Sequence, residues 1–406
     1  MKKLLSTLLL LLATTQAIAC TTAVLSGRFT KSGRPMIWKL RDTEAYDNHM
    51  QRFKSPLGYY IGLVNDSDTL ALQVWGGHNS HGFAIMNSAS FNVNHGYKGH
   101  YIDQEGVLMK RALAECHNLS EFEALLDALP RPMGLAAHFG VIDAEGGAAF
   151  YEVNNETWTK FDANEAPQGY VLRTNFSYTG TEDEGYGYVR YRCATNLFAP
   201  LKPGEVTVEL LGSRLSRSMY HGLLEIDYRE LAEKGQLPSR SGFVDSDDLI
   251  ARFDTSSMIL VEGVAKGEDP QLTTSWVEIG QPYLSPLIPV WTTNEIPAEL
   301  QSATSDKETI ASLAKELKRQ KLYPIRTVEE TRYLYMPLIY RPDGTGLAQQ
   351  LEALEAEYIP RLQATHSPQL QQEMIQKALQ LQRQALTSHS PQKSENGTSC
   401  NMLFVK

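Results

Sequence analysis

A cysteine placed directly after a removable leader could act as a nucleophile that carries its own base. Cys20 follows an apolar, leucine-rich run at residues 4–13 and the small-residue sequence Ala-Ile-Ala at residues 17–19. Signal peptidase cleaves after such small residues, and the apolar run is shorter than the roughly 20 residues that cross a bilayer. We therefore predict a signal peptide at residues 1–19 and a mature chain that begins at Cys20.

The new N-terminus would supply the base that a thiol requires. A free thiol has a pKa of about 8.5 and is mostly protonated at neutral pH, whereas an α-amino group has a pKa of about 7.7–8.0 and is partly neutral there. The amino group of Cys20 could take the thiol proton, directly or through a water, and return it to a leaving amine. This chemistry suits acyl transfer from an amide to sulfur and then to water, and it requires no histidine.

The residues that follow Cys20 resemble the start of a known class of enzymes. The sequence CTTAVLSGRFTKSGRPMIWKLRD is similar to the opening of the N-terminal-nucleophile hydrolases of the cysteine type, which form a β-hairpin followed by an aspartate. It most resembles the linear-amide hydrolases and acyltransferases related to isopenicillin N acyltransferase, with choloylglycine hydrolases and penicillin V acylases more distant. The resemblance implies that Cys20 is the nucleophile and that Asp42 orients it.

Two asparagines also match positions that this family keeps near the nucleophile. They are Asn87, in GFAIMNSAS, and Asn175, in LRTNF. An amide NH₂ group aimed at the reacting carbonyl would stabilise the oxyanion that forms there, and the resemblance implies this role for both. The alternative is that each asparagine caps its own backbone at a turn or at the end of a strand.

A basic side chain beside the thiol would favour the thiolate. Lys39 lies three residues before Asp42, where bile-salt hydrolases have an arginine, while Arg41 is adjacent to Asp42 and would point to the opposite face of the strand from it. Either could serve. Arg190 and Arg192, in GYVRYRC, resemble the family's later arginine, and the alternative for both is an ordinary surface or salt-bridge role.

Strands and helices must bring these residues together. Apolar and β-branched runs at residues 59–64, 70–75 and 82–91 predict successive strands. The runs at residues 136–142 and 147–153 flank the turn-rich sequence DAEG and predict a hairpin.

The segments beside these strands complete the prediction of the main domain. Residues 105–116 predict a helix, Ser120 with Glu123 predicts a capping box for a second helix that Pro130 limits, and residues 169–176 predict a strand. Strands followed by a helical pair and more strands predict an α+β layered domain. With the family resemblance, this implies an αββα four-layer sandwich with Cys20 at the end of the first strand, between the sheets.

Beyond residue 344 the composition shifts to Gln, Leu, Glu and Ala. Apolar residues from Leu347 to Tyr358 predict one helix, and after Pro360 a second helix is expected from about Leu370 to Leu386. These helices would pack on the main domain or form a dimerisation surface. The predicted organisation is a signal peptide, an N-terminal-nucleophile domain, C-terminal helices and a loose tail, at residues 1–19, 20–343, 344–386 and 387–406.

Composition argues against several other classes. Removal of Lys2 and Lys3 from a chain of formal charge −9 leaves −11, which disfavours nucleic acid and anionic lipid surfaces. Four scattered cysteines are too few for a disulfide scaffold or a structural zinc site. The histidines His78, His81 and His95 lack the spacing of a metal motif. We therefore expect no cofactor, no metal ion, no nucleic-acid partner and no transmembrane span in the mature chain.

The sequence leaves three hypotheses for Cys20. The first is an exported amidohydrolase, periplasmic or secreted, that cleaves a linear amide (an N-acyl amine, penicillin-like or peptide-like) through a thioester on Cys20, with an acyltransferase as its close alternative. The second is a non-enzymatic, lipid-anchored lipoprotein with Cys20 lipidated. The third is a structural disulfide from Cys20 to Cys193 or Cys400. Substrate identity is left open, although Trp75, Phe91 and Tyr97 could line an apolar pocket, and a homo-oligomer is compatible with all three.

Overall fold

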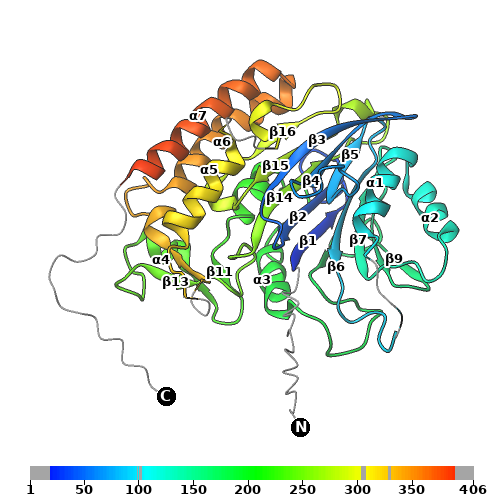
Figure 1. Ribbon diagram of the computed structural model, residues 1–406, viewed down its shortest axis with the longest axis horizontal. Coiled ribbons are helices and arrows are strands. Elements are labelled where there is room, and N and C mark those ends of the chain that lie inside the picture. The colour runs from blue at the N-terminus through cyan, green and yellow to red at the C-terminus, as the bar shows by residue number, and fades with distance from the viewer. Residues whose placement is uncertain (1–18, 98, 100–102, 303–307, 328–330, 389–406) are drawn as a thin grey trace, which may run out of the picture.

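Two antiparallel sheets stack face to face between two layers of helices (Figure 1). The computed structural model describes residues 19–97, 99, 103–302, 308–327 and 331–388. The six-stranded sheet consists, in order across it, of β10 (Tyr170–Arg173), β1 (Cys20–Leu25), β2 (Met36–Asp42), β14 (Thr255–Glu262), β15 (Thr274–Ile279) and β16 (Ile288–Val290). The seven-stranded sheet consists of β3 (Asn48–Ser55), β4 (Gly58–Asn65), β5 (Gly76–Asn79), β6 (Ala84–Ala89), β7 (Ala137–Ile142), β8 (Ala148–Val153) and β9 (Trp158–Asp162).

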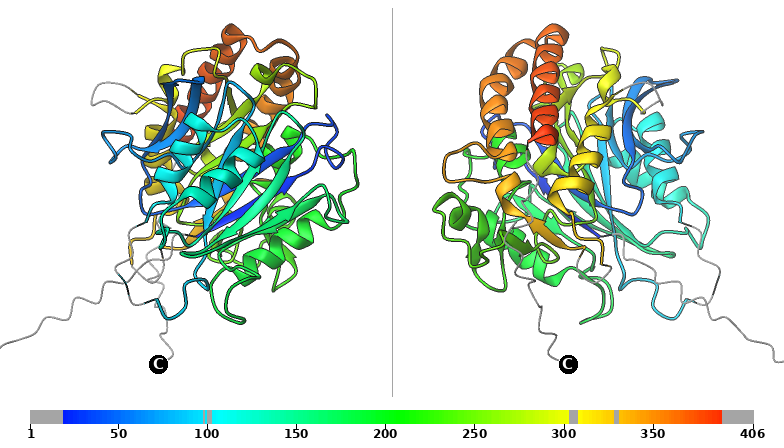
Figure 2. Two further views of the ribbon diagram at one scale, coloured as in Figure 1. Left: turned by 90° about the vertical axis from the view of Figure 1, so that its right-hand side faces the viewer. Right: turned by 60° about the vertical axis from the view of Figure 1, so that its left-hand side comes forward.

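Helices cover the outer face of each sheet (Figure 2). On the seven-stranded sheet, α1 (Glu105–Glu115) packs against β3 to β6, and Phe122 of α2 (Leu119–Ala128) contacts aromatic rings of β7 and β8. The six-stranded sheet is covered by α3 (Tyr188–Phe198), the π-helix η1 (Glu209–Leu215), α5 (Ile310–Leu317), α6 (Leu347–Thr365) and α7 (Pro368–Thr387). The predicted αββα sandwich is therefore confirmed.

Smaller elements complete the described fold. Two short pairs of strands lie apart from the main sheets. These pairs and the remaining helices are β11 (Tyr220–His221) with β12 (Ile226–Asp227), β13 (Phe243–Asp245) with β17 (Tyr333–Tyr335), α4 (Tyr228–Glu233), the π-helix Lys318–Leu322 and the 3-10 turns Pro270–Leu272, Pro282–Leu284, Ala298–Leu300 and Met336–Leu338.

The first hairpin, formed by β1 and β2, lies at the centre of the molecule, where both of its faces are covered. Every residue of β1 and of β2 is buried, as expected for strands that pack against the facing sheet on one side and helices on the other. The two strands pair from Cys20 opposite Arg41 to Leu25 opposite Met36. Cys20 is therefore the first residue of a central strand, at one end of the space between the sheets.

Most predicted elements are confirmed, but the strand expected at residues 70–75 is wrong. This segment is irregular, and the strand β5 begins only at Gly76. Ala71 has a φ of 48°, in the left-handed region that a strand does not use, and the carboxylate of Asp68 accepts a hydrogen bond of 2.8 Å from the backbone N–H of Gln73. The Asp68 turn therefore overrides the strand propensity of the apolar residues.

The predicted start of the second helix is also corrected. Its N-cap is Asn118, whose side chain accepts a hydrogen bond of 3.0 Å from the backbone N–H of Glu121. Ser120 is an exposed residue inside the first turn, so the capping box that we expected with Glu123 does not form. Asparagine is at least as good an N-cap as serine, and it comes two residues earlier. The helix ends before Pro130, as predicted.

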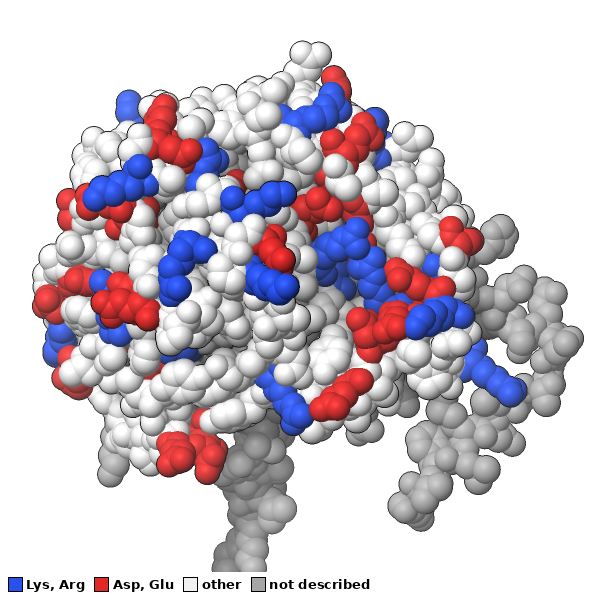
Figure 3. All heavy atoms as spheres, turned by 180° about the vertical axis from the view of Figure 1, so that it is seen from behind, with Lys and Arg blue, Asp and Glu red and all other residues white. Residues whose placement is uncertain are grey.

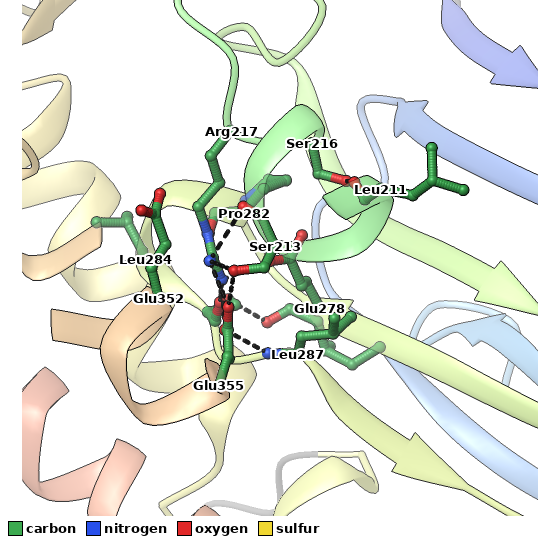
Figure 4. Close-up of polar contacts among 12 residues, drawn as sticks. Leu211, Ser213, Ser216, Arg217, Glu278, Pro282, Leu284, Leu287, Glu352 and Glu355 are labelled. Carbon is green, nitrogen blue, oxygen red and sulfur yellow. Dashed lines mark hydrogen bonds and ion pairs between the residues drawn. The ribbon is translucent and has the colours of Figure 1, made fainter. Parts of the chain in front are cut away.

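The C-terminal helices belong to the outer helical layer of the domain. Figure 4 shows the buried contact that anchors them: Arg217, which follows η1, pairs with Glu355 of α6 at 2.6 Å and with Glu278 of β15 at 2.5 Å. Pro360, expected between the two helices, lies inside α6 on its exposed side. Packing of the buried face carries the helix past the one backbone N–H that proline lacks.

Three further predictions concern charge, membranes and the chain ends. On the face seen in Figure 3, acidic and basic side chains intermingle without a large field of one sign. Within the described ranges, no helix combines the length and apolarity that a membrane span needs. The predicted signal peptide lies outside the described residues except for Ala19, as does the predicted tail beyond Ser388.

Candidate active site

The peptide unit that precedes Cys20 is held at both of its polar atoms. The backbone nitrogen of Cys20 donates a hydrogen bond of 3.0 Å to Oδ1 of Asn175, a residue 155 positions away that follows β10. The carbonyl oxygen of Ala19, in the same peptide unit, accepts a hydrogen bond of 2.9 Å from the backbone N–H of Asp42. The nitrogen that cleavage would convert to an amine is thus already fixed in position.

Arg190, from the first turn of α3, locks this arrangement. Its guanidinium donates hydrogen bonds of 2.7 Å to the carbonyl oxygen of Cys20 and 2.8 Å to Oδ1 of Asn175. Arg190 is only 3% exposed, and burial lowers its pKa. Arg192 instead lies at the surface and pairs with Glu225 at 3.2 Å. Of the two arginines in GYVRYRC, Arg190 therefore lies in the site.

Asn175 uses its carbonyl oxygen, rather than its NH₂ group, toward Cys20. That oxygen accepts from both the Cys20 nitrogen and Arg190, while Nδ2 donates to the carbonyl oxygen of Ala89 at 2.8 Å. This geometry orients the nitrogen of Cys20. A role for Asn175 as an oxyanion donor stays a prediction.

Lys39 and Arg41 lie on the same face of β2 as the thiol, toward the seven-stranded sheet. Lys39 Nζ donates to the carbonyl oxygen of Trp75 at 2.8 Å and to Oδ1 of Asn87 at 2.6 Å. Arg41 is paired directly with Cys20 across the ladder and donates to Asn65 at 2.9 Å. The structure thus brings both candidate cations to the site.

Burial dominates the ionisation of this group. It raises the pKa of the Cys20 thiol, and the largest opposing influence is the positive charge of Lys39, which lowers that pKa, ahead of the raising effect of Asp42. Burial also lowers the pKa of Lys39 to about 8, although a charged Cys20 acts in the other direction. Ionisation of the Cys20 thiol is therefore unfavourable without a cation beside it, and Lys39 is the cation that lowers the thiol pKa most.

The backbone N–H of Asp42 donates to the carbonyl oxygen of Ala19, next to Cys20, while its carboxylate is bound elsewhere. Oδ1 accepts from Thr255 at 2.6 Å and Oδ2 from Arg252 at 2.8 Å. The backbone N–H of Asp42 also lowers the pKa of the Cys20 thiol by hydrogen bonding. The expected orienting role of Asp42 remains a prediction.

Asn87 connects the site to a residue that sequence reasoning missed. Its Oδ1 accepts from Lys39, and its Nδ2 donates to the carboxylate of Glu105 at 2.6 Å. Glu105 is the first residue of α1, where an acidic side chain is ordinary, so nothing in the sequence indicated a contact with the site. Thr255 and Arg252 were also missed, because both lie more than 200 residues from Asp42 in the chain.

The other candidate groups lie apart from one another. His78 contacts Ser275 at 2.7 Å, His81 contacts the carbonyl oxygen of Leu57 at 2.7 Å, and His95 pairs with Glu184 at 3.2 Å. The described part of the chain contains no cluster of three or more His, Cys, Asp or Glu side chains suited to a metal ion.

The structure also locates the cysteines of the disulfide hypothesis and the three aromatic residues that were expected to line a pocket. Cys20 and Cys193 are both free thiols, so they do not form the disulfide that the third hypothesis allowed, and Cys400 lies outside the described residues. Tyr97 lines a cavity of about 470 Å³ beside α1, whereas Phe91 packs on Tyr186 with ring centroids 5.3 Å apart and Trp75 lies beside Arg41.

Sequence comparison now adds to this geometry. Residues 42–190 match the family model described as acyl-coenzyme A:6-aminopenicillanic acid acyl-transferase. Over that segment, the chain is similar to this family. The match begins at Asp42, ends at Arg190 and includes Asn87 and Asn175, so the family resemblance that we predicted from the sequence is confirmed. No curated protein matches the whole chain or a part of it.

Several solved structures share low sequence identity with the chain. A penicillin V acylase from Agrobacterium tumefaciens is 10% identical, with 68% of this chain and 87% of that chain covered and a TM-score of 0.35. A conjugated bile acid hydrolase variant from Clostridium perfringens is 13% identical, covering 71% and 98%, at 0.38. A penicillin G acylase from Alcaligenes faecalis is 11% identical, covering 92% and 80%, at 0.38. Because these TM-scores are all below 0.5, the description of the fold relies on the layers and strand order of this chain and not on these structures.

Proposed function

We propose that this chain is an exported N-terminal-nucleophile amidohydrolase in which Cys20, freed by removal of residues 1–19, attacks a linear amide and forms a thioester. One observation carries the proposal. The nitrogen of Cys20 lies 3.0 Å from Oδ1 of Asn175, and Arg190 holds both residues. A structural cysteine would not need its nitrogen held by a buried side-chain network.

The groups in the site suit each step of such a reaction. After cleavage, the neutral amine of Cys20 would donate one hydrogen to Asn175 and direct its lone pair toward the thiol proton. The positive charge of Lys39 would favour the thiolate, which attacks the carbonyl carbon of the amide. The protonated amine then returns its proton to the leaving amine, and water attacks the thioester to release the acid and free Cys20.

Hydrolase and acyltransferase differ only in the second half of this sequence. If an amine reaches the thioester in place of water, the acyl group is transferred to that amine and a new amide forms. The family description names an acyl-transferase that acts on 6-aminopenicillanic acid, so N-acyl amines, penicillin-like amides and peptide-like amides are the substrate classes that we propose. The leader sequence favours a periplasmic or secreted location.

The test compares chains that differ only in front of Cys20. One begins at Cys20 and the other carries Gly-Ser before it, and both are assayed on a panel of N-acyl amines, penicillins and dipeptides. We expect only the first to be active, because acylation of the amine abolishes its basicity. Cys20→Ala should be inactive, and Cys116→Ala, which removes another buried free thiol, should retain activity.

Two results would contradict the proposal. Full activity in the Gly-Ser version would mean that the base lies elsewhere. A diacylglycerol mass increment on Cys20 in the exported protein would favour the lipoprotein instead. An intact mass equal to that of unmodified residues 20–406 is the result that we expect.

A further inference from the structure

We propose that Glu105 is a positioning residue for Cys20, and that it acts through Asn87 on the ammonium group of Lys39. The inference rests on the proposed function, since it assigns a role in preparing the same nucleophile. Two hydrogen bonds form the link: Nδ2 of Asn87 donates to the carboxylate of Glu105 at 2.6 Å, and Nζ of Lys39 donates to Oδ1 of Asn87 at 2.6 Å. At the end of the link, the positive charge of Lys39 lowers the pKa of the Cys20 thiol.

An opening in the seven-stranded sheet makes this link feasible. The ladder between β5 and β6 ends at Gly76 opposite Met86, so Asn87 has a strand partner only on the β7 side. The irregular segment before β5 leaves the carbonyl oxygen of Trp75 beside it, and Lys39 binds that oxygen. Lys39 from the facing sheet and Glu105 from the outer helix can therefore both reach Asn87.

The carboxylate of Glu105 decides how the amide of Asn87 is turned. Because a carboxylate only accepts hydrogen bonds, it selects the NH₂ end and leaves Oδ1 for the ammonium of Lys39. The reverse orientation would place amide hydrogens against a cation. Glu105 is 4% exposed and also helps to keep Lys39 charged, since its negative charge raises the pKa of Lys39.

The charged groups around the thiol set the expected direction of any change. The groups that act on Cys20 are Lys39, Arg41 and Asp42, and those that act on Lys39 are Cys20, Arg41 and Glu105. If Glu105 loses its charge, Lys39 gives up its proton more readily and the thiolate loses its main counter-charge. The pKa of the thiol should therefore rise.

The experiment follows alkylation of Cys20 by iodoacetamide against pH in the chain that begins at Cys20, with Cys20 read by peptide mass. Glu105→Gln keeps the shape and an acceptor oxygen but removes the charge. We expect its alkylation midpoint to rise by about one pH unit, which is about tenfold slower reaction below the midpoint. Asn87→Ser breaks the link at its middle and should shift the midpoint in the same direction.

Asp103→Asn is the matched control. Asp103 carries a charge at the same end of α1 and accepts from the backbone N–H of Glu105, yet it does not contact Asn87. Its midpoint should stay at that of the unsubstituted chain. An unshifted midpoint in Glu105→Gln or in Asn87→Ser, or an equal shift in Asp103→Asn, would overturn the inference.

A second comparison separates this inference from the proposed function. Lys39→Met should itself raise the alkylation midpoint. Adding Glu105→Gln to it should cause no further change, because the ammonium group through which Glu105 acts is absent. An additional shift in the double variant would overturn the inference. Slow alkylation of Cys20 in the unsubstituted chain would instead count against the nucleophile itself.

Discussion

Replacing Arg217 should destabilise the fold strongly. Its guanidinium is fully buried and donates to Glu278, to both oxygens of Glu355 and to the carbonyl oxygens of Pro282 and Ser285 (Figure 4). Breaking a buried pair costs about 3–5 kcal/mol, because the remaining charge is left uncompensated. Arg217→Met leaves two such carboxylates, so we expect a loss at the upper end of this range.

The assay is equilibrium unfolding in urea, with the midpoint compared at constant slope. Arg229→Met is the matched control: Arg229 also binds α6, through Glu352 at 2.8 Å, but its side chain is 20% exposed. Water can replace part of what that variant loses, so its destabilisation should be clearly smaller.

A triple variant isolates the cause. Arg217→Met combined with Glu278→Gln and Glu355→Gln removes the cation together with both negative charges, and it should recover part of the stability that the single variant loses. A loss under about 1 kcal/mol in Arg217→Met, or a triple variant no more stable than the single one, would refute the argument from uncompensated charge.

Two further changes test the electrostatics of the chain. Burial lowers the pKa of Lys39 from 10.5 to about 8, so Lys39→Met should raise the free energy of unfolding in urea by up to about 3 kcal/mol. This gain should be complete below pH 8 and fade toward pH 10.5, and Cys20 should react more slowly in the same variant. A variant less stable than the unsubstituted chain would contradict this prediction. Asp42→Asn keeps an acceptor for Thr255 but loses the ion pair with Arg252, so its turnover is measured on protein shown to be folded. We expect slow turnover on whichever substrate the panel identifies, and unchanged turnover would remove the carboxylate from the mechanism.

The sequence predicts the parts of the fold that local patterns determine. The hairpin of β7 and β8 follows from two apolar runs around one short turn, and α7 follows from its apolar period. The segment at residues 70–75 has the same composition as a strand, yet one aspartate turn removes it from the sheet. Local propensity could not show that this irregularity leaves the carbonyl oxygen of Trp75 free to bind Lys39.

The site depends on contacts that no local pattern reveals. The nitrogen of Cys20 meets Asn175 across 155 residues, and only the family resemblance suggested that the two belong together. The resemblance could name Lys39 and Arg41 but not choose between them, because both lie on one face of β2. Glu105 matched no family position and occupies the most ordinary place for an acidic residue, the start of a helix.

The two buried groups of charges differ in a way that separates structure from chemistry. Around Arg217, two carboxylates surround one cation. Beside Cys20 the balance is reversed, because Lys39 is bound by neutral oxygens of Trp75 and Asn87, and Nη1 of the buried Arg41 has no hydrogen-bond partner among the described residues. Burial accordingly lowers the pKa of Arg41 to about 10. Positive charge kept short of partners destabilises the resting protein, and it becomes favourable only when a negative charge, such as a thiolate on Cys20, forms next to it.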